Sequence, residues 1–152
     1  MYKKIMEGNM INVHVHYVWT VKYRADVLHK SFRVELFQHI KQEALNKKIY
    51  IDSINGVEDH VHCLVSLTAT QTIAEVIKNI KGESSHWLNL KGYIPGQFKW
   101  QDGYGAFAVS PQNIKKVRNY IFKQEEHHRK YTFDDELEVF KQFNNLQIIG
   151  KI

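Results

Sequence analysis

The sequence MINVHVHYVWTVKY (residues 10–23) alternates between two kinds of side chain and is rich in Val, Tyr and Trp. Such alternation is typical of a strand with two different faces. The apolar face runs from Val13 to Val21, and the polar face carries His14 and His16. We therefore expect a strand that packs against a core on one side and presents histidines on the other.

The patterns that follow predict the rest of a small sheet. Ser31 can cap a helix whose apolar residues continue at helical spacing to about Lys48. Later patterns predict two strands, a second helix opened by a capping box and a short last strand, at residues 49–56, 60–67, 72–90 and 106–109. The order β-α-β-β-α-β predicts a ferredoxin-like α+β fold: an antiparallel sheet with helices on one face.

Two further helices are predicted after this unit. Ser110 and Pro111 form a typical helix start, and Thr132 opens a second one with a pattern resembling a capping box. With 152 residues we expect a single domain over residues 1–152, with a core at about 10–130 and a C-terminal helix and loose tail at about 132–152.

Composition restricts the class of protein. Hydrophobic residues make up 43% and there are only 2 prolines, which favours a folded globular chain. No apolar run approaches the roughly 20 residues of a membrane helix, and the single Cys63 cannot form an internal disulfide. We therefore expect no membrane association and a cytoplasmic protein. The net charge of +5 favours a polyanionic partner, with nucleic acid first.

Histidines gather on the polar face of the predicted sheet. His60 and His62 alternate on the third strand, and the fold should place them beside His14 and His16. Imidazole is a common ligand of divalent metals, so a metal site is one interpretation. Polar residues on a half-solvated sheet face are the other. Asp59 can be a further ligand, a group that orients His60 or a turn residue.

The helix after Ser110 carries a polar stripe. Lys116, Tyr120 and Gln124 recur every four residues and should share one helix face. A tyrosine hydroxyl can attack a phosphodiester and conserve the bond energy in a phosphotyrosine, which needs no nucleotide hydrolysis. The alternative is that Tyr120 fills the interface between helix and sheet and that Gln124 is solvated.

Three segments resemble one family of enzymes. GVEDHVHCLVSL (56–67), WQDGYGAFAVS (100–110) and VRNYIFKQEEHH (117–128) are similar to the single-tyrosine, HUH-type transposases of small bacterial insertion sequences, the IS two-hundred/six-hundred-and-five superfamily. The resemblance implies that His60, His62 and Gln124 bind Mg²⁺ or Mn²⁺ and that Tyr120 is the nucleophile. His14 and His16 would lie near the metal or the DNA, with structural roles equally open.

The resemblance also implies an activity and its partners. It implies metal-dependent cleavage and rejoining of single-stranded DNA at insertion-sequence ends through a 5′-phosphotyrosine, in a homodimer that recognises hairpin ends near the bacterial nucleoid. Two other functions remain open. One is a single-stranded nucleic-acid-binding module without catalysis, and the other is a domesticated or relaxase-like nickase.

Basic and aromatic residues are candidates for DNA contact. Each basic residue can pair with a phosphate or be plain solvated surface; these are Lys22, Arg24, Lys78, Lys81, Lys115, Lys116 and Arg118. Trp100 and Tyr104, in a loop with two glycines, can stack on bases or close a tight turn on an aromatic core.

Overall fold

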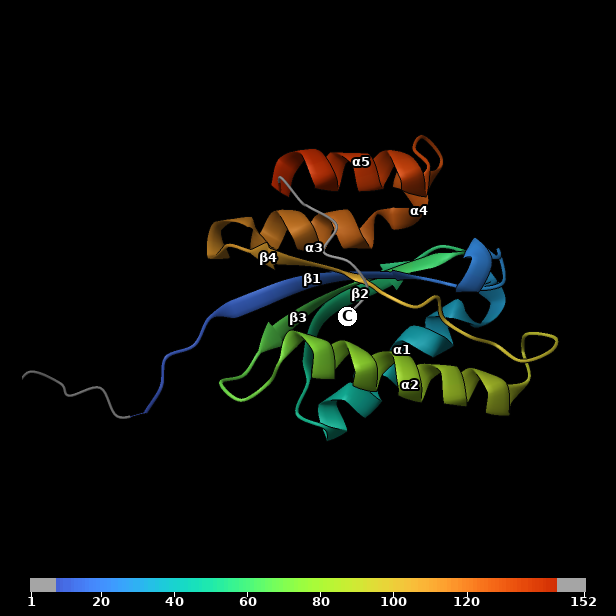
Figure 1. The fold of residues 1–152 in the computed structure, drawn as a ribbon, viewed down its shortest axis with the longest axis horizontal. Coiled ribbons are helices and arrows are strands. Elements are labelled where there is room, and N and C mark those ends of the chain that lie inside the picture. Colours follow the sequence, from blue (N-terminus) through green and yellow to red (C-terminus); the bar gives the residue numbers. More distant parts are fainter. Residues whose placement is uncertain (1–7, 145–152) are drawn as a thin grey trace, which may run out of the picture.

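A four-stranded antiparallel sheet organises the chain, as predicted. The structure is a computed structural model that describes residues 8–144, so the predicted tail after residue 144 lies outside the described residues. The strands occur in the order β2-β3-β1-β4 (Figure 1). Their bounds are Val13–Thr20 for β1, Tyr50–Gly56 for β2, His60–Leu67 for β3 and Gly105–Val109 for β4.

Two helices cover one face of this sheet and enclose the main core. They are α1, Lys30–Asn46, and α2, Ile73–Lys91, and they lie together below the strands in Figure 1. The apolar side chains of β1 and β3 point toward them, and Tyr17, Trp19 and Val61 are almost completely buried. The alternation read from residues 10–23 therefore assigns the core face correctly.

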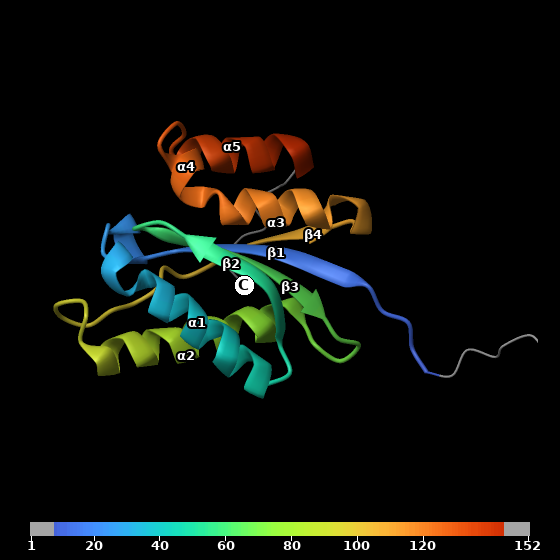
Figure 2. The same cartoon turned by 180° about the vertical axis from the view of Figure 1, so that it is seen from behind.

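The C-terminal helices cover the opposite face. They are α3, Ile114–Phe122, α4, Gln124–His128, and α5, Phe133–Asn144, and Figure 2 shows α3 and α5 across the sheet from α1 and α2. The face that the β-α-β-β-α-β order alone would leave without helices is therefore covered. No helix among residues 8–144 is long and apolar enough to cross a membrane.

Side chains of β2 hold α3 on the sheet. Asn55 donates hydrogen bonds of 3.0 Å to the carbonyl oxygens of Ile121 and Phe122 in the last turn of α3. Carbonyl groups at a helix end lack partners within the helix, so these bonds satisfy them and fix the position of the helix. Asp52 accepts two hydrogen bonds from Arg118, at 2.9 and 2.7 Å.

Some predicted boundaries are wrong by a few residues. The first helix begins at Lys30, with His29 at its N-cap and no side-chain cap, so Ser31 does not cap it. The first strand ends at Thr20, and residues 22–24 form a short 3₁₀ turn in which Tyr23 has a φ of 60°. The predicted caps at Thr72 and Thr132 are confirmed, because each hydroxyl accepts a backbone N–H three residues later.

Gly56 permits a close approach between β2 and β3. A Cβ atom there would lie 2.3 Å from the carbonyl oxygen of His60 and 3.0 Å from the Cα of Val61, and neither backbone atom can move freely. We expect Gly56→Ala to lower the free energy of unfolding by about 1–3 kcal/mol, measured by urea denaturation followed by circular dichroism.

Gly82→Ala is the matched control. Gly82 is exposed on α2, and an added Cβ would meet nothing within 4 Å. Because alanine favours helix over glycine, we expect this variant to be more stable by up to about 1 kcal/mol. A Gly56→Ala protein as stable as the wild type would contradict the close approach.

Candidate functional site

Two histidines of β3 lie buried beneath the C-terminal helices. His60 and His62 have no exposed surface, and their rings leave the sheet on the face opposite α1 and α2. The pairing of β1 with β3 sets Thr20 opposite His60 and Val18 opposite His62. This register brings His16 to the same face, where its Nε2 lies 2.8 Å from Nδ1 of His62.

A neighbouring group fixes the orientation of each ring. Nδ1 of His60 lies 2.6 Å from Oδ1 of Asp59, which precedes it in the chain, and Nδ1 of His62 is hydrogen-bonded to His16. In the tautomer that carries its proton on Nδ1, each Nε2 has a lone pair, directed away from these partners, that can bind a metal ion. Arg24 supports the arrangement, because its Nε lies 3.5 Å from Asp59.

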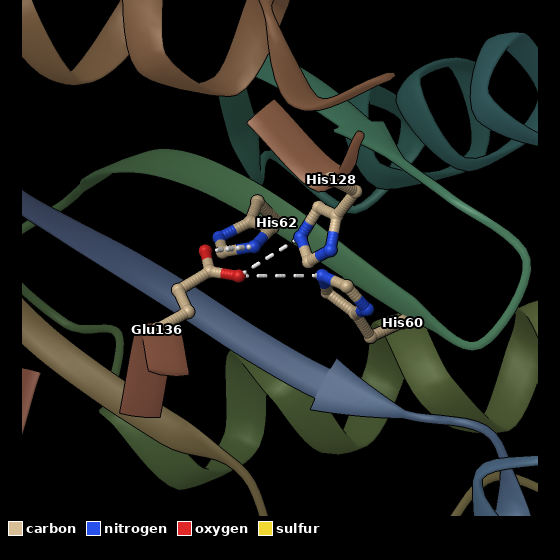
Figure 3. Close-up of side chains that lie close together, drawn as sticks. All are labelled: His60, His62, His128 and Glu136. Atoms are coloured by element: carbon tan, nitrogen blue, oxygen red, sulfur yellow. Dashed lines mark hydrogen bonds and ion pairs between the residues drawn. The ribbon is translucent and has the colours of Figure 1, made fainter. Parts of the chain in front are cut away.

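Two residues that the sequence did not assign complete the cluster. Glu136, in the first turn of α5, lies 2.8 Å from Nε2 of His62, 3.6 Å from Nε2 of His60 and 3.0 Å from Nε2 of His128. The nearest ligand atoms of these side chains all lie within 4.8 Å of one another (Figure 3). The sequence offered two signals for these residues, the paired histidines at 127–128 and the predicted helix start at Thr132. Neither pattern indicated a contact with β3.

Tyr120 enters the same cluster from α3. Its hydroxyl donates a hydrogen bond to the Glu136 carboxylate, and its ring meets the His62 ring edge-on, with the centroids 5.6 Å apart. All of these side chains belong to one chain. The structure thus brings together a tyrosine hydroxyl and a set of nitrogen and oxygen donors from one chain.

Gln124 is fully buried beside this group. A turn at Lys123 separates it from α3, so it opens α4 instead of continuing the tyrosine helix. Its Nε2 nevertheless lies 3.3 Å from the backbone carbonyl oxygen of Tyr120, and its Oε1 has no hydrogen-bond partner. The solvated position that the sequence left open for Gln124 is therefore wrong.

Burial and charge shape the protonation of the cluster. Burial lowers the pKa of His62 to about 4 and that of His16 to about 3, so both rings are neutral near pH 7. Burial opposes ionisation of Glu136, yet the neighbouring imidazoles of His128, His60 and His62 hold the pKa of its carboxyl well below the usual range. Burial and the charge of Glu136 raise the pKa of Tyr120, whose hydroxyl keeps its proton.

The donors present fit a divalent metal ion. Nε2 of His60, Nε2 of His62 and Oε1 of Gln124 are buried without a hydrogen-bond partner, although a carboxylate lies near both nitrogens. Unpaired buried polar atoms are costly, and the two histidine nitrogens belong to one group of donors that could hold an ion. The Nδ1 atoms of His60 and His62 are already hydrogen-bonded, as is usual for metal-binding histidines.

The basic residues predicted to contact DNA fall into two groups. Lys78, Lys115 and Lys116 are exposed. The others already have partners within the chain: Arg24 pairs with Asp134 at 2.8 Å, Arg118 with Asp52 at 2.7 Å, and Lys81 donates to the carbonyl oxygens of Gln101 and Gly103. Lys22 is partly exposed, with its ammonium over the Tyr23 ring.

The two aromatic candidates also differ. Trp100 is only 7% exposed, packs edge-on against Trp19 and donates from Nε1 to the Ser84 hydroxyl at 3.0 Å. This placement agrees with an aromatic core beneath the loop and leaves no open ring face for a base. Tyr104 is 43% exposed and stays accessible.

A hollow of about 790 Å³ opens beside Tyr120. It lies between β4, α3 and α5, and its walls include His16, Phe107, Lys116, Tyr120 and Glu136. Aromatic walls with a lysine at the side suit an unpaired nucleotide strand, because bases stack on rings and phosphates pair with ammonium groups. The hollow therefore offers a path from the surface to the Tyr120 hydroxyl.

Comparisons with known proteins identify similar sequences. The model of the family described as Transposase IS200 like matches residues 9–124. The ISDra2 transposase TnpA of Deinococcus radiodurans is 28% identical over 122 residues, which cover 77% of this chain and 87% of the relative.

Two solved structures share the fold. One is a crystal structure assigned as a transposase from Deinococcus radiodurans R1, with a TM-score of 0.62 at 24% identity over 80% of this chain and 98% of that one. The other is a REP-associated tyrosine transposase bound to a REP hairpin, with a TM-score of 0.60 at 16% identity over 84% of this chain and 74% of that one.

Asp59 provides a test of the orienting contact. Asp59→Asn removes the negative charge behind His60, so we expect the affinity for Mn²⁺ to fall by about tenfold or more. Isothermal titration of the purified protein without DNA measures it. Asp26→Asn, at an exposed position, should bind Mn²⁺ like the wild type. Equal affinity in both variants would show that the Asp59 contact does not matter for the metal.

Proposed function

Because the chain belongs to the IS200-like transposase family, we propose that it cleaves and rejoins single-stranded DNA through a covalent bond to Tyr120, with Mg²⁺ or Mn²⁺ as cofactor. The family match confirms the resemblance found in the sequence. The observation that carries the proposal is the placement of the Tyr120 hydroxyl at a buried cluster of histidines from the same chain.

The residues take separate roles in this proposal. His60, His62 and Gln124 hold the ion, and Asp59 and His16 keep the two rings in place. When bound, a divalent ion supplies Lewis-acid polarisation of the scissile phosphate and stabilises the leaving oxygen. Tyr120 supplies the nucleophile, held at the cluster by its hydrogen bond to Glu136.

The covalent step is a transesterification. The Tyr120 oxygen forms a bond to phosphorus while the bond between phosphorus and the 3′-oxygen breaks. The hydroxyl proton leaves the tyrosine and, through solvent, the 3′-oxygen gains one, so the products are a 5′-phosphotyrosine and a free 3′-hydroxyl. Attack by a 3′-hydroxyl reverses these bond changes and rejoins a strand, so neither direction consumes water or a nucleotide.

The substrate proposed is single-stranded DNA that carries a hairpin near its cleavage site. One support is the relative solved with a REP hairpin, and another is the aromatic hollow that leads to Tyr120. Exposed Lys115 and Lys116 flank the tyrosine helix and suit phosphate contacts. DNA of this kind would place the protein in the bacterial cytoplasm, at the nucleoid. The homodimer implied by the resemblance stays a prediction.

Tyr120→Phe tests the nucleophile. Labelled single strands from both ends of the gene's flanking DNA are mixed with protein in Mn²⁺ or in chelator, and SDS-resistant adducts are separated on a denaturing gel. We expect an adduct with the wild type in Mn²⁺ only, and none above background with Tyr120→Phe, because phenylalanine has no oxygen to bond phosphorus.

Tyr50→Phe is the control, since Tyr50 is a half-exposed tyrosine of the edge strand β2. It should form the adduct at the wild-type level. An adduct that persists in Tyr120→Phe would refute the assignment of the nucleophile. Retarded DNA in a native gel with no adduct under any condition would instead support a binding module.

A further inference from the structure

The family match ends inside the site. It covers residues 9–124, which include His60, His62, Tyr120 and Gln124. His128 at the end of α4 and Glu136 in the first turn of α5 lie beyond the match, yet both belong to the cluster (Figure 3). The match with the family therefore assigns no role to either residue.

The spacing of the donor atoms is close to that of ligands around one ion. Glu136 oxygens lie 2.8, 3.0 and 3.6 Å from the Nε2 atoms of His62, His128 and His60. Ligands at about 2.1 Å from a common ion are about 3.0–3.4 Å apart when they are neighbours. The carboxylate therefore sits where a further ligand would sit.

Ion pairs with Glu136 account for only part of the polar groups in this cluster. Nε2 of His60 and Nε2 of His62 have no hydrogen-bond partner among the described residues despite the nearby carboxylate. Glu136 is only 4% exposed, and its carboxylate is hydrogen-bonded to Tyr120 and His128. A cation at the centre would pair with the carboxylate and the lone pairs of both nitrogens at once.

From this geometry we infer that Glu136 and His128 bind the same divalent ion as His60 and His62, so that α5 completes the metal centre. The inference deepens the proposed function and rests on it for the use of the ion. With Gln124, the resulting donor set contains three imidazoles, one carboxylate and one amide oxygen. Imidazoles favour transition metals, whereas Mg²⁺ prefers oxygen ligands, so this centre takes Mn²⁺ or a similar first-row ion in preference to Mg²⁺.

A different role for Glu136 would be a plug that blocks the site. Its carboxylate accepts the Tyr120 hydrogen bond and occupies space near the nucleophile. However, an ionised carboxylate beside three imidazoles attracts a divalent cation instead of excluding it. The two roles make opposite predictions, because removing a ligand weakens metal binding and removing a plug strengthens it.

The packing of α5 against the rest of the chain favours Glu136 as a permanent part of the metal centre. Phe133 is buried against the His60 ring, with centroids 4.5 Å apart, and Arg24 lies over its other side at 4.9 Å. Further along α5, Phe140 stacks on Phe107 of β4 at 4.7 Å. These contacts on both sides of Glu136 hold its carboxylate at the cluster.

Metal binding by the full chain without DNA tests the inference. Mn²⁺ is titrated into wild type, Glu136→Gln and Glu138→Gln, and free Mn²⁺ is followed by electron paramagnetic resonance. Glu138 lies on the same helix, 62% exposed and paired with Lys141. We expect Glu136→Gln to weaken Mn²⁺ binding by at least about tenfold, and Glu138→Gln to bind like the wild type.

A second pair of variants protects the test against a folding defect. His128→Gln should also weaken Mn²⁺ binding by at least about tenfold, whereas His86→Gln, at an exposed position of α2, should not. Thermal unfolding in chelator shows whether each variant keeps the fold without metal. We also expect the wild type to bind Mn²⁺ more tightly than Mg²⁺ by at least about tenfold.

The outcomes separate this inference from the proposed function. The ligand set would be overturned if the folded Glu136→Gln and His128→Gln variants bind Mn²⁺ as tightly as the wild type or more tightly. It would also be overturned if the wild type does not bind Mn²⁺. Equal affinities of the wild type for Mn²⁺ and Mg²⁺ would overturn the ion preference. Binding of Mn²⁺ that depends on Glu136, with no DNA adduct, would refute the strand transferase and keep the metal centre. If Tyr120 forms a DNA adduct but Mn²⁺ binding does not depend on Glu136 and His128, the strand transferase stands and the inferred ligand set is refuted.

Discussion

The site depends on the need to satisfy two fully buried imidazoles on one strand. His60 and His62 each bond through Nδ1, to Asp59 and His16, so that both Nε2 atoms face the C-terminal helices. The contact with His16 requires the observed register of β1 against β3, because a slip of one residue would turn His16 toward the core. The register of the strands therefore fixes the orientation of the rings, and the orientation of the rings fixes the direction of both Nε2 atoms.

The second layer of helices turns this strand feature into an enclosed site. α3 is fixed on β2 by Asn55 at its end, which sets Tyr120 above His62. α5 is fixed by Phe133 and Phe140, which sets Glu136 between the nucleophile and the histidines. Exclusion of water strengthens charge interactions among these groups. The same burial keeps His16 and His62 neutral, so their nitrogens carry no charge that would repel a cation.

The sequence predicted the sheet and most of the face that packs against α1 and α2, but only part of the site. Alternation in residues 10–23 and the paired histidines of β3 report a local period, which strand geometry converts directly into a shared face. The capping patterns at Thr72 and Thr132 are local as well, and both were confirmed. Glu136 could not be assigned, because its role depends on how α5 folds back over β3, a long-range contact that leaves no periodic signal. Trp100 shows the same limit: a glycine-rich loop can present or bury an aromatic ring.

The position of Glu136 and His128 after residue 124 also affects how proteins of this kind can diversify. The strand motif and the tyrosine lie within the segment shared with the family, whereas these two groups lie in the C-terminal part of the chain. On the inferred ligand set, exchanging only the segment after Gln124 between two relatives would replace the ligands at 128 and 136 and leave His60, His62 and Tyr120 unchanged. Chemistry at the tyrosine and dependence on a particular ion in the cell can then evolve separately.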